Sequence, residues 1–172
     1  SGGAQLNNPV SIFVSGNYAY VTSLMSPALE IIDISNPASP THTGAITSGI
    51  GAPRDVFVSG NYAYVASYSS NSLEIIDISN PANPIRKGAI SDGTDGARLA
   101  TPNSVYVSGN YAYVVSSGSD SLEIIDISNP ASPTHKSSIY DGLGGALLGD
   151  PDSVFISGKY AYIASVTSNA LE

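Results

Sequence analysis

The chain has 172 residues and a formal net charge of −8 at pH 7, from 14 acidic and 6 basic side chains. Hydrophobic residues make up 42% of it and charged residues 12%, which excludes a disordered chain and predicts one domain with a buried core. The basic residues are few and scattered, which argues against nucleic acid as a partner, and the lack of cysteine excludes disulfides and thiolate metal sites. No signal peptide is visible, because the chain starts without a basic, apolar leader, but its first residue need not be the natural one, so localisation stays open; the short apolar runs predict no transmembrane segment.

The first predicted element is a β-hairpin, "SIFVSGNYAYV" at residues 11–21. Two β-rich runs flank Ser-Gly-Asn, where Gly16 supplies the positive φ of a tight turn. The octamer "VSGNYAYV" returns in slightly altered form every 44 to 49 residues, so the sequence is a repeat. The equivalent turn glycines are Gly60, Gly109 and Gly158.

Two further strands are predicted after each hairpin. A Ser-rich loop leads to "LEIIDIS" at 29–35, whose nearly continuous apolar run indicates a strand buried on both faces. "NPASP" then turns the chain, and "THTGAI" at 41–46 is a fourth strand. The third-strand motif recurs from Leu73 and Leu122, and no segment has a helical period with caps.

Four antiparallel strands in each unit of this length are typical of propeller blades. A parallel β-helix is the competing fold, but its coils are shorter and lack the hairpin. The sequence therefore predicts an all-β fold, a β-propeller of four-stranded antiparallel blades, with about three and a half blades in a partial ring. We place the blades at approximately 9–46, 53–90, 102–139 and, incomplete, 151–172.

The octamer itself is explained by packing between blades. In "YAYV" the two tyrosines point to one face of the sheet, and Ala and Val point to the other. We expect the tyrosine face of each blade to fill the shallow alanine face of the next. Eight of the eleven tyrosines lie in these octamers, so the repeated interface accounts for most of this residue type.

The combined motif "VSGNYAYV…LEIIDISNPASP" resembles the LVIVD repeat, named for its third-strand core, which reads "LEIID" here. The resemblance covers essentially the whole chain. It implies a β-propeller of the kind found in bacterial and archaeal proteins that are often surface-exposed or secreted, and it brings no shared catalytic residues. We therefore expect an extracellular or cell-surface protein that is not an enzyme, needs no cofactor and presents loops for interaction.

The ends of the chain raise the question of ring closure. The start, "GGAQLNNP", aligns with the inter-blade loops before the later blades, and the end falls inside the fourth blade after two predicted strands. The chain is either a fragment of a longer propeller or one of two copies that join head to tail into a ring of roughly eight blades. Because a lone copy would expose an apolar blade face at each end, we expect a homo-oligomer, with a dimer favoured.

Repeated polar residues have a structural and a functional interpretation. An Asp precedes each Ser-Asn-Pro turn, where its carboxylate can accept backbone N–H bonds, so we expect a structural role. His42 and His135 occupy equivalent fourth-strand positions, with Arg86 between them, and we expect exposed edge residues because zinc needs three or four converging ligands. The turn aspartates are Asp33, Asp77 and Asp126.

The inter-blade loops carry the remaining candidates. Their acids and glycines suggest calcium or a small ligand near the ring axis, although the spacing matches no known calcium loop. Acids of different blades could also meet at the axis as a hydrolase, but no nucleophile motif is present. We assign no catalytic or metal residue; the binding site stays unknown, and a forced choice would be Asp95, Arg98, Asp150 and Asp152. The loop residues considered are Asp92, Asp95, Arg98, Asp141, Asp150 and Asp152.

Overall fold

The structure, a computed structural model, describes residues 3–4 and 6–172. In that part of the chain the strands form four antiparallel sheets in sequence order, joined by loops that include two short 3-10 turns. The first sheet holds β1 (Pro9–Ser15), β2 (Tyr18–Ser23), β3 (Ala28–Asp33) and β4 (Thr41–Ile46); the second holds β5 (Pro53–Ser59), β6 (Tyr62–Ser67), β7 (Ser72–Asp77) and β8 (Ile85–Ser91). The third holds β9 (Pro102–Ser108), β10 (Tyr111–Ser116), β11 (Ser121–Asp126) and β12 (Thr134–Tyr140), and the fourth β13 (Pro151–Ser157), β14 (Tyr160–Ser165) and β15 (Ala170–Leu171); the 3-10 turns are η1 (Thr94–Gly96) and η2 (Leu143–Gly145).

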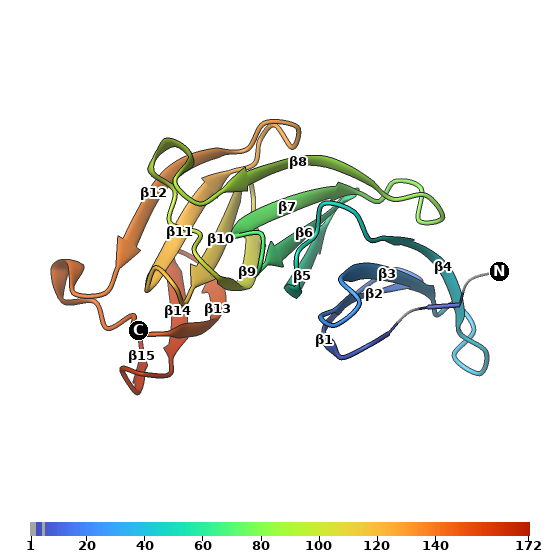
Figure 1. Cartoon of the computed structure of the whole chain (residues 1–172), viewed down its shortest axis with the longest axis horizontal. Coiled ribbons are helices and arrows are strands. Elements are labelled where there is room, and N and C mark those ends of the chain that lie inside the picture. Colours follow the sequence, from blue (N-terminus) through green and yellow to red (C-terminus); the bar gives the residue numbers. More distant parts are fainter. Residues whose placement is uncertain (1–2, 5) are drawn as a thin grey trace.

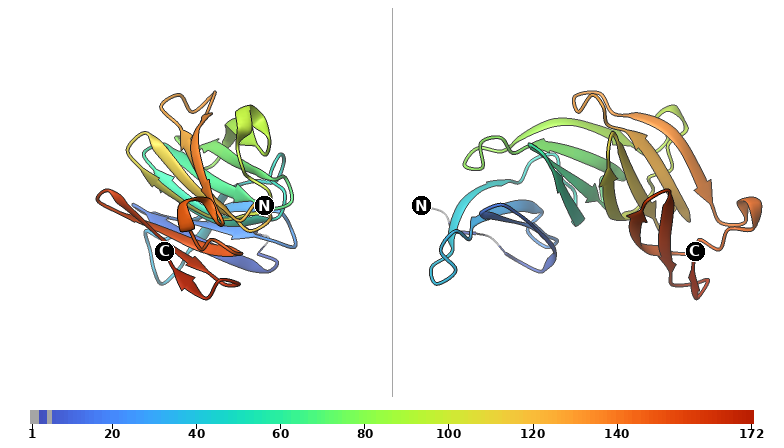
Figure 2. Two further views of the ribbon diagram at one scale, coloured as in Figure 1. Left: turned by 90° about the vertical axis from the view of Figure 1, so that its left-hand side faces the viewer. Right: turned by 180° about the vertical axis from the view of Figure 1, so that it is seen from behind.

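The sheets are the blades of an open propeller. Each is a meander in which neighbouring strands of the chain pair, and the first strands β1, β5, β9 and β13 lie next to one another on the inner side of the arc. Figures 1 and 2 show the blades fanning out from these inner strands, with the two termini at opposite ends of the arc and no closed ring. The predicted all-β propeller is confirmed, and the fourth blade has a short third strand, β15, beyond the two strands expected.

The hairpin turns follow the sequence prediction. Gly16 has φ of 56°, and the three equivalent glycines have φ of 57° or 58°, in the left-handed region that disfavours a side chain. In the first blade Ser15 pairs with Tyr18 across the turn. The tight turn thus fixes the register that places both octamer tyrosines on one face of the blade.

The core lies between blades rather than inside them. Tyr20, Leu29 and Ile31 of the first blade pack against Val58 and Ala63 of the second, together with neighbouring apolar residues. The same tyrosine-to-alanine packing recurs between the second and third blades and, more thinly, between the third and fourth. The predicted complementarity of the two octamer faces is therefore confirmed.

The repeated turn aspartates have the structural role that the sequence predicts. Asp33, Asp77 and Asp126 each accept a hydrogen bond from the backbone N–H of the serine two residues later, at 2.8 to 3.0 Å. The hydroxyl and the amide of that serine stabilise the carboxylate and hold the pKa of each Asp below its usual value. These residues close the turn after the third strand and lie on the surface. Within the described residues, no helix has the length and apolar character needed to cross a membrane.

Candidate functional site

The inner strands open onto a polar cavity at the propeller axis. Each begins with a proline, and the residue before that proline has a positive φ, 59° at Asn8 and 52° at Asp150. Beside each proline the ladder shifts register by one residue, a β-bulge that redirects the next side chain. The cavity has a volume of about 380 Å³ and is lined by residues of all four blades: Val10, Ser11, Leu24, Arg54, Asp55, Asn103, Ser104, Asp152 and Ser153.

Asp55 connects three blades beneath this cavity. Its Oδ1 accepts hydrogen bonds from the Ser11 hydroxyl, at 2.7 Å, and from the Val56 N–H, at 2.9 Å. Its Oδ2 accepts bonds from the Ser104 hydroxyl, at 2.9 Å, and from the Val105 N–H, at 3.0 Å. Both carboxylate oxygens are thus occupied by donors from the first, second and third blades. Asp55 is a structural anion at the axis rather than a free acid or base.

Asn103 supplies a buried amide at the same cavity. Its side chain is only 9% exposed, and its Nδ2 donates to the Pro151 carbonyl at 3.0 Å, which joins the third blade to the fourth. Its Oδ1 has no hydrogen-bond partner among the described residues, although a buried carbonyl oxygen without a partner costs about 1–3 kcal/mol. The cavity wall therefore contains a buried hydrogen-bond acceptor without a donor among the described residues.

Two opposite charges stand at the cavity and are exposed to solvent. Arg54 follows the proline of β5, and its guanidinium lies over the Tyr68 ring, 4.3 Å from the centroid. Asp152 occupies the equivalent position on β13, two blades away. The aromatic contact restrains the Arg54 side chain, which leaves a fixed cation at the cavity.

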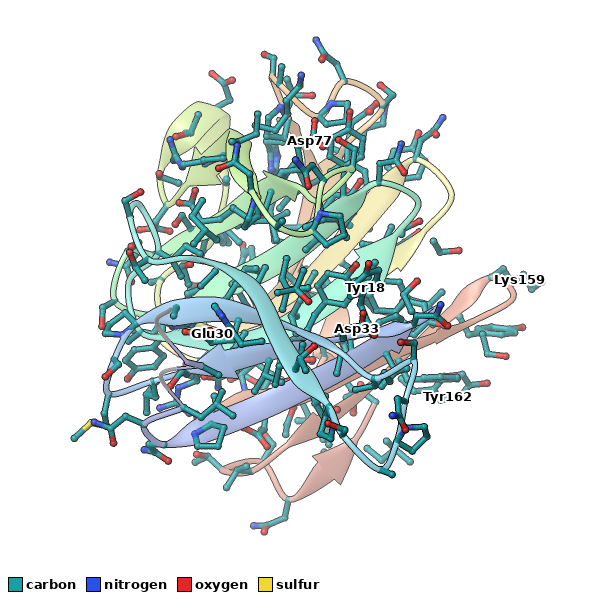
Figure 3. The ribbon with its side chains drawn as sticks, turned by 90° about the vertical axis from the view of Figure 1, so that its right-hand side faces the viewer. Tyr18, Glu30, Asp33, Asp77, Lys159 and Tyr162 are labelled. Carbon is teal, nitrogen blue, oxygen red and sulfur yellow. The ribbon has the colours of Figure 1, made fainter. Side chains whose placement is uncertain are left out.

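A second set of polar side chains is buried on the third strands of the first three blades. Glu30, Glu74 and Glu123 are almost fully buried in the third strands of their blades. Each pairs with a basic residue of the outer strand, and in the first blade His42 Nε2 lies 2.9 Å from Glu30 Oε2. Figure 3 looks onto the first blade and shows Glu30 well separated from Asp33 at the end of β3. The other two pairs are Glu74 with Arg86 and Glu123 with His135.

Glu123 also fixes the loop between the second and third blades. Its Oε2 accepts the Arg98 N–H at 3.0 Å, and the Ser121 hydroxyl donates to the Arg98 carbonyl at 3.2 Å. Burial raises the pKa of Glu123, against the hydrogen bonds from Arg98 and His135 that lower it. Glu123 therefore has a structural role, in which it binds the loop at Arg98 and the outer strand at His135, and burial makes its charged form unfavourable.

The family model of the LVIVD repeat matches residues 9–47, 50–92, 101–141 and 148–170, most of the chain. The chain belongs to the LVIVD repeat family. Comparison with curated proteins gives no match.

Solved structures similar to this LVIVD repeat chain share the propeller fold. A Bacteroides uniformis protein described as a "putative 6-phosphogluconolactonase" has 18% identity and a TM-score of 0.78, with 95% of this chain and 49% of that chain covered. A Lactobacillus plantarum protein has 15% identity and a TM-score of 0.76, with 98% and 55% covered. The computationally designed Ika4 protein has 8% identity and a TM-score of 0.72, with 99% and 91% covered. The chain thus spans about half the length of the two natural proteins, and likeness at these identities concerns the fold alone.

The loop residues chosen from the sequence do not come together in this LVIVD repeat chain. Asp152 lines the axial cavity, while Asp95 belongs to η1, which packs against the outer strand β12. The Arg98 guanidinium lies over the Tyr140 ring, 4.0 Å from its centroid, and Asp150 is held by its N–H bond to the Asp120 carboxylate.

The other loop acids serve the backbone. Asp92 accepts the Leu99 N–H and Asp141 accepts the Leu148 N–H, both at 2.8 Å, so each closes its own loop. In the part of the chain that the structure describes, no three or more His, Asp or Glu side chains gather as a metal site would require. The two histidines do lie on outer strands as expected, but their rings turn inward onto the buried glutamates.

Sequence reasoning missed Asp55, Asn103 and the buried glutamates. A signal for the glutamates was present, because "LEIID" places an acid in a strand otherwise read as apolar, and a basic residue recurs in every fourth strand. The position after each opening proline also differs in all four blades, whereas the other positions of the inner strand vary less: Val10, Arg54, Asn103 and Asp152. Variable positions within a repeated strand are the signal for the cavity.

Proposed function

We propose that this LVIVD repeat chain is a non-enzymatic binding module that forms half of a propeller ring, completed head to tail by a second copy. The observation that carries the proposal is the exposure of two blade faces whose equivalents inside the chain are packed against each other. The loops around the axis would then be presented to a partner, in keeping with the surface location that is common among proteins with this repeat.

The first blade exposes the apolar face that each later blade buries. Ile12 is 62% exposed, whereas Val56, at the equivalent position of the second blade, is 3% exposed. The neighbouring Val14 is likewise exposed, and its equivalent Val58 is buried. A contiguous apolar patch of this kind marks an interface. The second blade shows what covers it: the tyrosine face of a preceding blade.

The fourth blade exposes that tyrosine face. Tyr162 is 44% exposed, whereas its first-blade equivalent Tyr20 is 4% exposed. Figure 3 shows Tyr162 at the margin of the molecule. The open end of the chain therefore presents the surface that the open start requires, which favours a second copy as the occupant of both.

An aromatic ladder along the inner strands supports the same arrangement. The rings of Phe13, Phe57, Tyr106 and Phe155 follow one another with centroid distances of 4.8, 4.7 and 5.3 Å. The last ring, Phe155, is 56% exposed and lacks a next rung. In a ring of two copies the next rung is Phe13 of the second copy. The two identical contacts, each joining a fourth blade to a first blade, close the ring with two-fold symmetry.

Light scattering behind a sizing column tests the assembly. We expect a mass of twice the chain's 17.6 kDa, and one copy's mass for the variants Ile12→Asp and Tyr162→Asp. Ile85→Asp is the matched control, because the exposure of Ile85 lies between those of Ile12 and Tyr162 but the residue is on the outer strand β8, away from both faces. A wild-type chain that stays monomeric at all concentrations overturns the proposal, and further blades would then have to cover these faces.

Mixing the two monomeric variants tests the head-to-tail geometry. In a mixed pair both substitutions fall in one contact, and the other contact joins an unaltered fourth blade to an unaltered first blade. We expect the mixture to regain a dimer that neither variant forms alone. A mixture that stays monomeric, or a dimer that persists in one variant, contradicts this geometry.

The non-enzymatic part of the proposal rests on the state of the axial acids. Two solved neighbours, at 18% and 16% identity, carry the name "putative 6-phosphogluconolactonase". Acid–base chemistry needs a carboxyl group free to exchange protons with a substrate. Both oxygens of Asp55 are engaged by hydroxyl and amide donors, so Asp152 is the one carboxylate left free among the residues that line the cavity, and a hydrolase with paired carboxylates needs two. Turnover of a lactone or glycoside that Asp152→Asn abolishes would refute this part.

A further inference from the structure

We infer that the axial cavity binds a neutral carbohydrate, one or two sugar units in size, between Arg54 and Asp152. This inference deepens the proposed binding function and rests on it, since it assigns that function a ligand class. The cavity volume of about 380 Å³ falls within the range of roughly 300–1,000 Å³ seen for small-molecule sites.

The polar groups of the cavity call for a ligand that both donates and accepts. Asn103 Oδ1 is a buried acceptor that lacks a partner among the described residues, and the Asp152 carboxylate is an exposed acceptor. Arg54 is a donor held over Tyr68. The Ser104 hydroxyl gives its proton to Asp55 and keeps lone pairs for a ligand. Sugar hydroxyls can serve donors and acceptors at the same time, which suits this mixture.

The charges of the cavity favour a neutral ligand over an ion. An anion would bind Arg54 but would also face the carboxylates of Asp55 and Asp152. A divalent cation would meet the guanidinium, and the four donors on Asp55 already occupy the carboxylate oxygens that it would need. An uncharged molecule avoids both conflicts, because the charges of Arg54 and Asp152 nearly cancel each other.

The remaining walls suit the apolar face of a sugar ring. Val10 and Leu24 line the cavity beside the polar groups, and Val10 is largely exposed on the first blade. Sugar rings present C–H groups on one face, and burying them against aliphatic side chains is favourable. The site thus combines oriented polar groups with apolar contact, as small-molecule sites do.

Isothermal titration calorimetry on the full chain tests the inference. The sugar probes are D-glucose, D-galactose, N-acetyl-D-glucosamine, maltose and cellobiose. Calcium chloride and inorganic phosphate are titrated separately to represent the alternative ligands, a divalent cation and an anion. We expect at least one neutral sugar to bind with one site per chain. Arg54→Gln and Asp152→Asn should each weaken it at least tenfold, since each removes a charged hydrogen-bond partner.

The control variants are matched in chemistry and placed outside the cavity. Arg98→Gln removes the same kind of arginine–tyrosine contact at Tyr140, and Asp95→Asn neutralises an exposed acid on η1. Both should leave the affinity within twofold of the unaltered chain. Failure of every sugar to bind, equal loss in the controls, or binding of calcium or phosphate in place of sugar overturns the inference.

The sugar titration and the light-scattering experiment test the carbohydrate site and the ring independently of each other. A dimer by light scattering without sugar binding refutes the carbohydrate site and leaves the ring standing. A monomer that binds sugar in an Arg54-dependent manner refutes the ring and leaves the site standing.

Discussion

Replacing Asp55 with asparagine perturbs the point where three blades meet. Asparagine keeps the shape of the side chain but turns one acceptor oxygen into an NH₂ group. Either Ser11 and the Val56 N–H, or Ser104 and the Val105 N–H, then face a donor instead of an acceptor. The substitution therefore removes two of four hydrogen bonds and leaves a backbone N–H unsatisfied.

The size of the effect follows from the bonds lost. A hydrogen bond to a charged group contributes about 1.5–3 kcal/mol. Two such bonds set an upper value of about 6 kcal/mol, which partial exposure and serine rotation reduce. We expect the free energy of unfolding of Asp55→Asn to fall by about 2–4 kcal/mol, a large part of the stability of an ordinary domain.

Urea unfolding followed by tyrosine fluorescence measures this loss, because the chain has 11 tyrosines and no tryptophan. Protein concentration must be held constant, since self-association would add to the apparent stability. Asp152→Asn is the control: the same chemical change, at the same cavity, on an exposed residue, where we expect a change within about 0.5 kcal/mol. A loss below about 1 kcal/mol for Asp55→Asn would show that the carboxylate does not hold the blades together.

Two further predictions concern the blade interfaces. A Cβ on Gly44 would lie 2.4 Å from the Pro81 carbonyl oxygen in the turn of the next blade. We therefore expect Gly44→Ala to lower the free energy of unfolding, measured with urea, by more than about 2 kcal/mol. Ser137→Ala, at the equivalent outer-strand position, is the control and should change it little. Burial raises the folded-state pKa of Glu123, so the unfolded chain releases this proton first, and stability declines as pH rises from about 4.5 through the folded pKa. Glu123→Gln should remove that decline, so its stability should rise relative to that of the unaltered chain over this interval. If the urea midpoints of the two chains instead change in parallel from pH 4 to 7, the prediction is wrong.

The repeat made most of the fold predictable from the sequence. Because the octamer recurs in a constant register, turn chemistry at Gly16 and the alternation of "YAYV" determine which face each tyrosine occupies, and the same answer holds for every blade. These are local signals with a period of two. The blade interfaces follow from them by complementarity, as the packing of Tyr20 on Ala63 shows.

The axial site was not predictable in the same way, because its contacts join residues 44 to 50 positions apart that meet only when blades stand side by side. Nothing local marks Asp55 as a partner of Ser11 and Ser104. The buried glutamates escaped for a different reason: the leucine and three isoleucines of "LEIIDI" outweigh the acids between them when the strand is judged by its overall hydrophobicity. Aligning third strands with fourth strands would have paired Glu123 with His135.

The inner strand places its packing residues and its cavity residues at different points along its length. Its later residues, such as Val56 and Val58, face the neighbouring blade and change little between repeats. Its first residues, next to the bulge, face the axis; the residue after the proline differs in every repeat, and the one that follows is Asp55 in the second blade and serine in the other three. Substitutions directly after the proline, at exposed positions such as Arg54 and Asp152, would therefore alter the charge of the cavity with little effect on the blade interface, whereas Asp55 takes part in both. In the proposed ring and binding site, the near-identical octamers would carry the fold, the residue after each opening proline would determine the ligand, and Asp55 would link the two.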